Sequence, residues 1–201
     1  MTCPSRSGVP SSERMLEKVI IINTWLVKNI IYVFHNFGRK GGKWIYRKEG
    51  FRSVRTRSGG VNDLPGLMAL EEGAFGPKRF PEAFVLELLH DPLVTTLLVE
   101  AEGAVVAYAM IRSSPAYQTV EVLSLAVSPL YRRKGLGRGL MQEVERSSVD
   151  SGTETVILYV RPENQAAVNL YLSQGYKVLA CCRNYYGEGS DANMMVKHLE
   201  E

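Results

Sequence analysis

The sequence contains little cysteine and little histidine, and this scarcity argues against several classes of protein. Its three cysteines are Cys3, Cys181 and Cys182, and the last two are neighbours that are poorly placed to bridge each other. A disulfide-stapled secreted scaffold is therefore not expected. The chain has three histidines, and no Cys/His spacing resembles a metal site. We expect no metal centre and a reducing, cytoplasmic environment.

The chain also lacks a long apolar run without charge. Its longest apolar segment, residues 19–37, approaches the length of about 20 residues that a membrane span needs. Lys28 and Asn29 lie at its centre, where a charge costs about 2.5–3.5 kcal/mol. No small-residue cleavage site follows, as a signal peptide would require. A docking or partly ordered helix, a membrane-surface anchor and an extension without a role in activity all stay open.

Charge is distributed unevenly along the chain. Residues 1–58 hold 12 Lys and Arg against 3 Asp and Glu, whereas the whole chain has a net charge of +3. A basic leader therefore precedes an acidic body of a size that suits one core. We expect residues 1–50 to be an extension, with residues 1–18 disordered, and residues 51–201 to be the domain. Membrane contact through residues 19–48 is not favoured, and no nucleic-acid partner is expected.

Hydrophobic periodicity from residue 51 onward predicts one α/β domain. The expected order of elements is β-α-α-β-β-β-α-β-α-β-β, with Asp63, Pro81 and Asn164 near helix starts. A hairpin is expected around Glu102 and Gly103. The predicted strands are 51–56, 96–100, 105–112, 119–127, 155–160, 176–182 and 194–198.

A glycine-rich loop between the predicted strand 119–127 and the helix that follows is the most informative stretch. Residues 131–141 read Tyr-Arg-Arg-Lys-Gly-Leu-Gly-Arg-Gly-Leu-Met. Glycines allow the backbone to approach a ligand, and the free N–H groups of a helix start favour an anion. A basic turn before a helix would explain the stretch equally simply, because glycine-rich loops are common. The stretch has neither the Gly-Lys-Ser/Thr end of a Walker loop nor a Rossmann fingerprint.

Three separated motifs resemble one family. Arg132, Gly135 and Gly137, placed after Ala126-Val127-x-Pro129, are similar to the acetyl-CoA pyrophosphate loop of the GNAT N-acetyltransferases. Residues 160–167, with the later Leu-Tyr and Gly-Tyr pairs at 170–171 and 175–176, look like the family's fourth-helix signature. Residues 185–195 resemble the Tyr-Tyr-x-x-Gly-x-Asp-Ala-x-x-Met tail of the RimI/Ard1 group of protein Nα-acetyltransferases. The resemblance covers residues 51–199.

The resemblance implies the GNAT fold, a mixed and mostly antiparallel sheet with splayed central strands and flanking helices. It implies acetyl-CoA as cofactor and a protein or peptide N-terminal α-amine as acceptor. Asn164 is equally plausible as a plain helix cap. The cofactor-binding positions that it implies are Leu125, Ala126, Val127, Arg132, Arg133, Lys134, Gly135, Leu136, Gly137, Arg138, Asn164, Asn169 and Tyr171.

The same resemblance implies an acid and a base for the transfer. Tyr171 matches the family's tyrosine beside the sulfur and is expected to be the general acid, unless it is only a core tyrosine. The group commonly offers Glu or His where this chain has Tyr159, and a phenol with a pKa near 10 is a poor base. Glu121 is the alternative base, because strand alternation would place it on one face with Leu123 and Leu125. An exposed strand-end glutamate would explain Glu121 equally simply. The expected substrate contacts are Phe75, Glu121, Tyr159, Tyr185 and Tyr186.

Two other functions stay open. The enzyme could acetylate a lysine or a small amine, or the chain could be a GNAT-shaped module that binds CoA or a peptide without turnover. The sequence does not distinguish a monomer from a homodimer.

Overall fold

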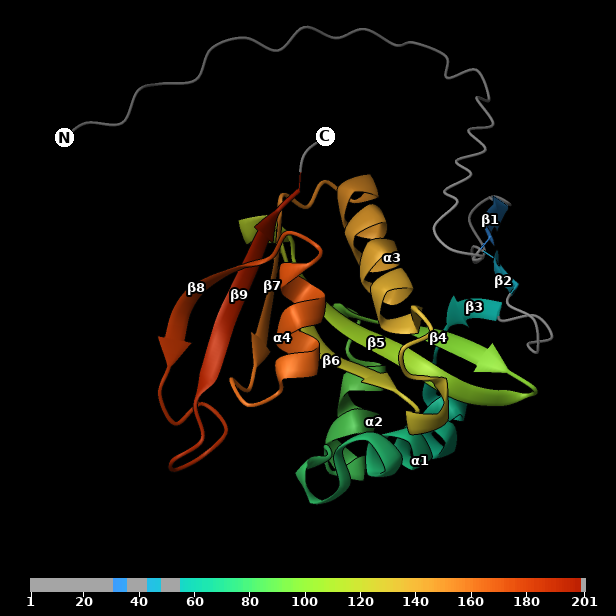
Figure 1. Cartoon of the computed structure of the whole chain (residues 1–201), viewed down its shortest axis with the longest axis horizontal. Helices are drawn as coiled ribbons and strands as arrows, with labels where there is room; N and C mark the ends of the chain where they lie inside the picture. The colour runs from blue at the N-terminus through green and yellow to red at the C-terminus, as the bar shows by residue number, and fades with distance from the viewer. Residues whose placement is uncertain (1–30, 36–42, 48–54, 200–201) are drawn as a thin grey trace, which may run out of the picture.

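The computed structural model describes residues 31–35, 43–47 and 55–199. Residues 55–199 follow the order of strands and helices that the sequence predicts (Figure 1). The helices are α1 (Leu64–Phe75), α2 (Glu82–His90), α3 (Leu136–Asp150) and α4 (Gln165–Leu172). The strands are β3 (Arg55–Ser58), β4 (Val94–Ala101), β5 (Ala104–Ser114), β6 (Thr119–Val127), β7 (Thr155–Val160), β8 (Lys177–Cys182) and β9 (Ala192–His198).

These seven strands form one sheet in the order β3-β4-β5-β6-β7-β9-β8. Only β6 and β7 are parallel, and every other neighbouring pair is antiparallel. The predicted hairpin is confirmed, because Glu102 and Gly103 between β4 and β5 have φ values of 54° and 81°. Two positive φ values in a two-residue turn match the twist of the flanking strands. The predicted α/β fold with a mixed, mostly antiparallel sheet is therefore confirmed.

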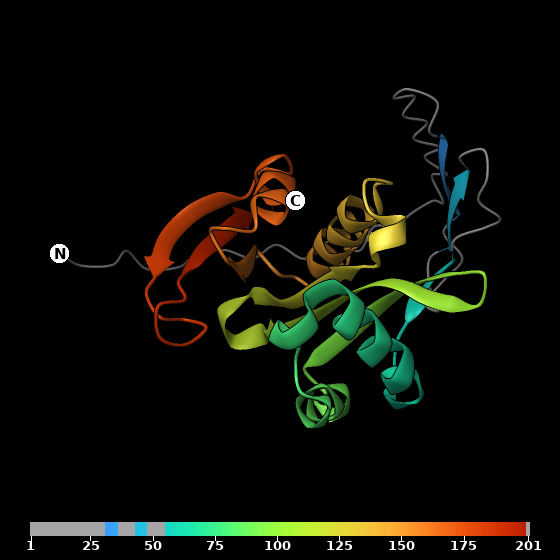
Figure 2. The same ribbon diagram turned by 60° about the horizontal axis from the view of Figure 1, so that its bottom comes forward.

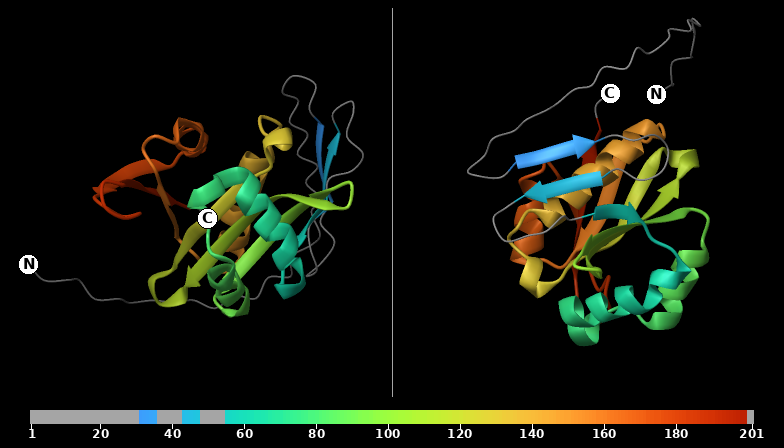
Figure 3. Two further views of the ribbon diagram at one scale, coloured as in Figure 1. Left: turned by 90° about the horizontal axis from the view of Figure 1, so that it is seen from below. Right: turned by 90° about the vertical axis from the view of Figure 1, so that its right-hand side faces the viewer.

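Helices cover both faces of the sheet. One face carries α1 and α2, seen in front of the strands in the left view of Figure 3, and buries Leu67, Leu88 and Tyr108 with their neighbours. The other face carries α3 and α4 and buries a second set that includes Val144 and Tyr171. In the described part of the chain, no helix is long and apolar enough to cross a membrane.

The sheet splits where β6 meets β7. Register pairs join these strands only from Thr119 to Val122 on β6. Beyond that point the half formed by β7, β9 and β8 turns away from the half formed by β4, β5 and β6, as Figure 2 shows. The splayed central strands expected from the family are therefore present, and they leave residues 123–127 without a strand partner on the β7 side.

A β-bulge in β6 corrects one sequence expectation. Met110 on β5 pairs with Ser124, whereas Ile111 pairs with Val122, so Leu123 is an extra residue in β6. An extra residue reverses the alternation of side chains beyond it. Leu123 accordingly packs on the α1 face and Leu125 on the α3 face. The expectation that Glu121, Leu123 and Leu125 share one face was wrong for Leu125.

Two further differences concern the first part of the chain. Ile31–His35 (β1) pairs antiparallel with Lys43–Arg47 (β2), so this part of the segment 19–37 is a strand and not the docking helix considered above. Its β-branched and aromatic residues suit a strand. The first strand of the domain was expected at 51–56, but β3 runs to Ser58 and residues 51–54 lie outside the described residues. Residues 1–30 lie outside them as well.

The expected cap of α1 is only partly confirmed. Asp63 does occupy the N-cap position, but its side chain makes no capping bond to the helix. Its carboxylate accepts hydrogen bonds from the Arg57 guanidinium at 2.6 and 2.9 Å and from the Gly60 N–H at 2.9 Å. The Arg57 bonds hold the pKa of Asp63 below its ordinary value. Asp63 therefore ties β3 to the start of α1.

Candidate active site

A cavity of about 570 Å³ lies at the split between β6 and β7. Ser124 and Leu125 from the bulged part of β6 line it, as do Tyr159 on β7 and Tyr171 on α4. The wall on the α1 side comes from Glu71 and from Phe75, Lys78 and Phe80. The cavity thus combines an unpaired strand edge with titratable side chains, which is the arrangement expected of a binding or catalytic site.

The glycine-rich loop leads from β6 into the start of α3. Gly135 is the N-cap of α3 with a φ of 86°, and no side chain caps the helix. Backbone donors at this helix start are therefore available to an anion. A Cβ on Gly137 would lie 3.3 Å from Leu170 of α4 and 3.7 Å from Val127 of β6. The strand end, the helix start and α4 therefore meet at this glycine.

Three of the four cations of the loop hydrogen-bond to nearby chain atoms. Arg132 donates from Nε to the Val127 carbonyl at 3.1 Å, and Arg138 donates to the Ser173 hydroxyl at 2.9 Å. Lys134 donates to the Leu130 carbonyl at 2.7 Å. Arg133 is exposed and has a φ of 61°. Four cations beside free N–H groups make the loop suitable for a polyanionic group such as a pyrophosphate.

Of the two asparagines expected to contact cofactor, Asn164 is the N-cap residue of α4 and Asn169 lies on that helix. Asn164 Oδ1 accepts from the Ala167 N–H at 3.3 Å, so Asn164 does cap the helix, and it also lines the cavity. Asn169 is exposed on α4 and is not among the residues that line the cavity.

Tyr171 is a buried side chain at the cavity. It is 6% exposed and lines the cavity, and its ring contacts Tyr176 edge-on with centroids 5.8 Å apart. Burial raises the pKa of Tyr171 far above its ordinary value, with a smaller contribution from Tyr186. A phenol in this environment keeps its proton at neutral pH.

Glu121 lies on β6 and is not among the residues that line the cavity. Partial burial raises the pKa of its carboxyl group, and the positive charge of Arg112 opposes this shift. After burial, the next contribution to the raised pKa values of Tyr159 and Tyr185 is the charge of Glu121. The Glu121 carboxylate therefore lies near Tyr159 and Tyr185, which are also among the predicted substrate contacts.

The predicted tyrosines form one aromatic cluster at the mouth of the cavity. Tyr159 stacks on Tyr185 with centroids 4.3 Å apart, and Tyr185 meets Tyr186 edge-on at 4.8 Å. The Tyr186 hydroxyl donates to the Tyr159 carbonyl at 3.0 Å. Arg161 lies 4.1 Å from the centroid of the Tyr186 ring and donates to the Ser190 hydroxyl. These contacts hold the loop between β8 and β9 against β7.

Sequence reasoning missed the buried carboxylate of Glu71, and with it Tyr108 and Ser124. Glu71 is 1% exposed and accepts hydrogen bonds from both of these side chains. A signal was present, because Glu71 follows Leu67 by four residues and thus falls on the apolar face of α1. An acidic residue at a core position is informative, since such residues are seldom buried without partners.

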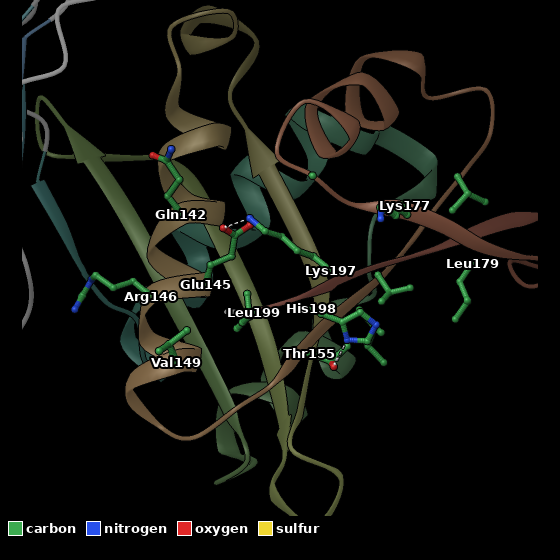
Figure 4. Close-up of a pocket in the computed structure, with 14 residues that line it drawn as sticks. Gln142, Glu145, Arg146, Val149, Thr155, Lys177, Leu179, Lys197, His198 and Leu199 are labelled. Carbon is green, nitrogen blue, oxygen red and sulfur yellow. Dashed lines mark hydrogen bonds and ion pairs between the residues drawn. The ribbon is translucent and has the colours of Figure 1, made fainter. Parts of the chain in front are cut away.

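A second and larger cavity of about 1040 Å³ lies between α3 and the strands β7, β9 and β8. Figure 4 shows Glu145 of α3 and Lys197 of β9 pointing toward each other there, with Nζ and Oε2 2.7 Å apart. Thr155 and His198 hydrogen-bond at 3.0 Å in the same cavity. None of the residues predicted to bind cofactor or substrate lines this cavity, so we place the candidate active site in the smaller one.

Comparisons with known proteins agree with this geometry. Residues 64–176 match the acetyltransferase (GNAT) family. An N-alpha-acetyltransferase from Sulfurisphaera tokodaii is 30% identical over 159 residues, which cover 74% of this chain and 95% of that protein. The [ribosomal protein bS18]-alanine N-acetyltransferase of Escherichia coli K12 is 40% identical over 65 residues, 32% of this chain and 44% of that protein.

Solved structures give the same result. The crystal structure of the ribosomal-protein-S18-alanine N-acetyltransferase from Escherichia coli has a TM-score of 0.67 at 26% identity, over 74% of this chain and 95% of that one. Ard1 from Thermoplasma volcanium has the same fold, with a TM-score of 0.67 at 23% identity over 74% of this chain and 99% of that one. The family match spans more than half of the sequence, and this chain therefore belongs to the GNAT acetyltransferase family.

Proposed function

We propose that this protein transfers the acetyl group of acetyl-CoA to the α-amine of a protein or peptide N-terminus. The cavity at the β6–β7 split is the observation that supports this most, because it joins an unpaired strand edge to Tyr171 and to the Tyr159–Tyr185–Tyr186 cluster. The relatives named N-alpha-acetyltransferase support the choice of acceptor.

The residues present suit acetyl-CoA. The start of α3 offers uncapped N–H groups beside Arg132, Arg133, Lys134 and Arg138, which fit a pyrophosphate. The free edge of Leu125–Val127 offers backbone donors and acceptors to an extended pantetheine arm. Bound acetyl-CoA would supply an activated acetyl thioester.

The chain's own residues supply the proton transfers. Glu121 takes the proton of the acceptor ammonium through water, for which its raised pKa is suitable. Backbone N–H groups of the free β6 edge stabilise negative charge at the carbonyl oxygen. Tyr171 donates its proton to the departing sulfur. Tyr159, Tyr185 and Tyr186 bind and orient the peptide, with Phe75 on the opposite wall.

A peptide panel tests this function. The purified full chain is incubated with acetyl-CoA and with peptides that differ in their first residue. An N-terminally blocked peptide with an internal lysine, and a polyamine, serve as the other acceptors. We expect acetylation of free N-termini alone. Acetylation of the lysine or the polyamine would show that the acceptor belongs to that class instead. Acetyl-CoA binding without any product would show that the protein is a binding module.

A further inference from the structure

Glu71 is a buried charged residue in the cavity that takes no part in the proton transfers above. It lies on the sheet-facing side of α1 and is 1% exposed. Burying a carboxylate costs free energy unless hydrogen bonds replace its water. The partners of Glu71 therefore indicate what the residue does.

Three groups donate to this carboxylate, and they come from different elements. Oε2 accepts from the backbone N–H of Phe80, between α1 and α2, at 2.9 Å. Oε1 accepts from the Tyr108 hydroxyl on β5 and from the Ser124 hydroxyl on β6 at 3.2 Å. The Tyr108 and Ser124 oxygens lie 2.8 Å apart. One side chain thus joins the α1–α2 loop to the sheet at the bulge.

The position of that loop decides the shape of the acceptor cavity. Phe75 at the end of α1 and the loop residues Lys78 and Phe80 line this cavity together with Tyr159 and Tyr186. Ser124 is the first residue after the extra residue of the bulge and lines the same cavity. A carboxylate that bonds to Phe80 and to Ser124 fixes the distance between this loop and the strand.

We propose that Glu71 is a positioning residue for the acceptor, which holds the α1–α2 loop in the conformation that binds the peptide. This role rests on the proposed function, because it concerns the acceptor side of the same cavity. It places no contact between Glu71 and the reacting atoms. Loss of Glu71 should therefore weaken peptide binding and leave acetyl-CoA binding unchanged.

The neighbouring residue provides a matched control. Glu72 pairs with Arg79 of the same loop at 2.6 Å, but the two side chains are 66% and 38% exposed. An exposed ion pair is screened by solvent and contributes little. If the buried Glu71 and not this exposed pair holds the loop, Glu72→Gln should behave like the wild-type protein.

The test compares Glu71→Ala, Glu71→Gln and Glu72→Gln in the full chain. For Glu71→Ala we expect the KM for the peptide to rise about tenfold or more, as for a lost hydrogen bond to a charged group. For Glu71→Gln we expect a smaller rise, because an amide keeps part of the hydrogen bonding. The calorimetric Kd for acetyl-CoA should stay within about twofold in all three variants. The Phe80 amide should exchange hydrogen faster in Glu71→Ala than in Glu72→Gln.

An unchanged peptide KM in folded Glu71→Ala would overturn the proposal. So would a parallel loss of acetyl-CoA affinity, or an equal effect of Glu72→Gln. If Glu71→Ala does not fold, Glu71→Gln and Tyr108→Phe carry the same comparison. If the wild-type protein acetylates no peptide, the proposed function fails, and Phe80 amide exchange still decides whether Glu71 holds the loop.

Discussion

Replacing Tyr171 by phenylalanine separates chemistry from stability. The Tyr171 hydroxyl makes no hydrogen bond to the described part of the chain, and the ring packs on Tyr176. Phenylalanine keeps that ring contact and removes only the oxygen. We therefore expect the free energy of unfolding to change by no more than about 0.5 kcal/mol.

The effect on turnover should be much larger. If Tyr171 donates the proton to the departing sulfur, its loss lowers kcat by about 10²–10⁴, which corresponds to roughly 3–5 kcal/mol in the barrier. Burial raises the pKa of Tyr171, so the phenol is protonated throughout the range from pH 6 to about 9. The loss should consequently be nearly independent of pH there.

The assay follows thiol release with a peptide that the wild-type protein acetylates, together with calorimetric binding of acetyl-CoA and a thermal melt. Tyr176→Phe is the matched control, because the Tyr176 hydroxyl is buried near Glu145 and Tyr176 does not line the cavity. It should retain kcat within about twofold. A folded Tyr171→Phe with wild-type kcat and wild-type cofactor affinity would show that Tyr171 is only a core residue.

Four further predictions concern the cofactor loop, the base, the pH dependence of stability and the N-terminal extension. Gly137→Asp should abolish detectable acetyl-CoA binding in calorimetry, because a side chain and a negative charge enter the start of α3. The control Gly139→Ala should bind acetyl-CoA normally, because a Cβ at Gly139 meets open space. Glu121→Gln should lower kcat most at neutral pH and less at high pH, where the amine loses its proton unaided. Tyr159→Phe should act mainly on the KM for the peptide. If instead Tyr159→Phe abolishes turnover and Glu121→Gln has no effect across the pH range, Tyr159 is the base. Because burial raises the pKa of Glu121, its charged form destabilises the folded state as pH rises through that pKa. Glu121→Gln should therefore melt higher than the wild-type protein at pH 7, and this difference should vanish in acid. Deleting residues 1–50 should leave a cooperatively folding, active domain, because the seven-stranded sheet begins at β3 (Arg55–Ser58); loss of folding would place part of that segment in the core.

The fold could be predicted because its signals are local. Strand β7 and strand β6 begin and end where alternation and β-branched residues place them. Gly135 and Asn164 mark the starts of α3 and α4 by the chemistry of helix ends. The family motifs then joined these elements into one topology, which no single pattern of periodicity could do.

The rest could not be predicted because it depends on contacts through space. The extra residue at Leu123 has no marker in the sequence, and it alone reverses the face on which Leu125 lies. The bonds from Glu71 to Tyr108 and Ser124 join residues 37 and 53 positions apart. An acidic residue on the apolar face of a helix shows that a partner is needed but does not identify that partner.

The most direct test of the central claim is to locate the acetyl group on a peptide that carries both a free α-amine and a lysine. The full chain and acetyl-CoA are incubated with this peptide, and fragmentation mass spectrometry assigns the modified nitrogen. The account predicts one acetyl group, on the α-amine, formed by the wild-type protein and strongly reduced in Tyr171→Phe. Acetylation of the lysine, or equal product from Tyr171→Phe, would contradict it.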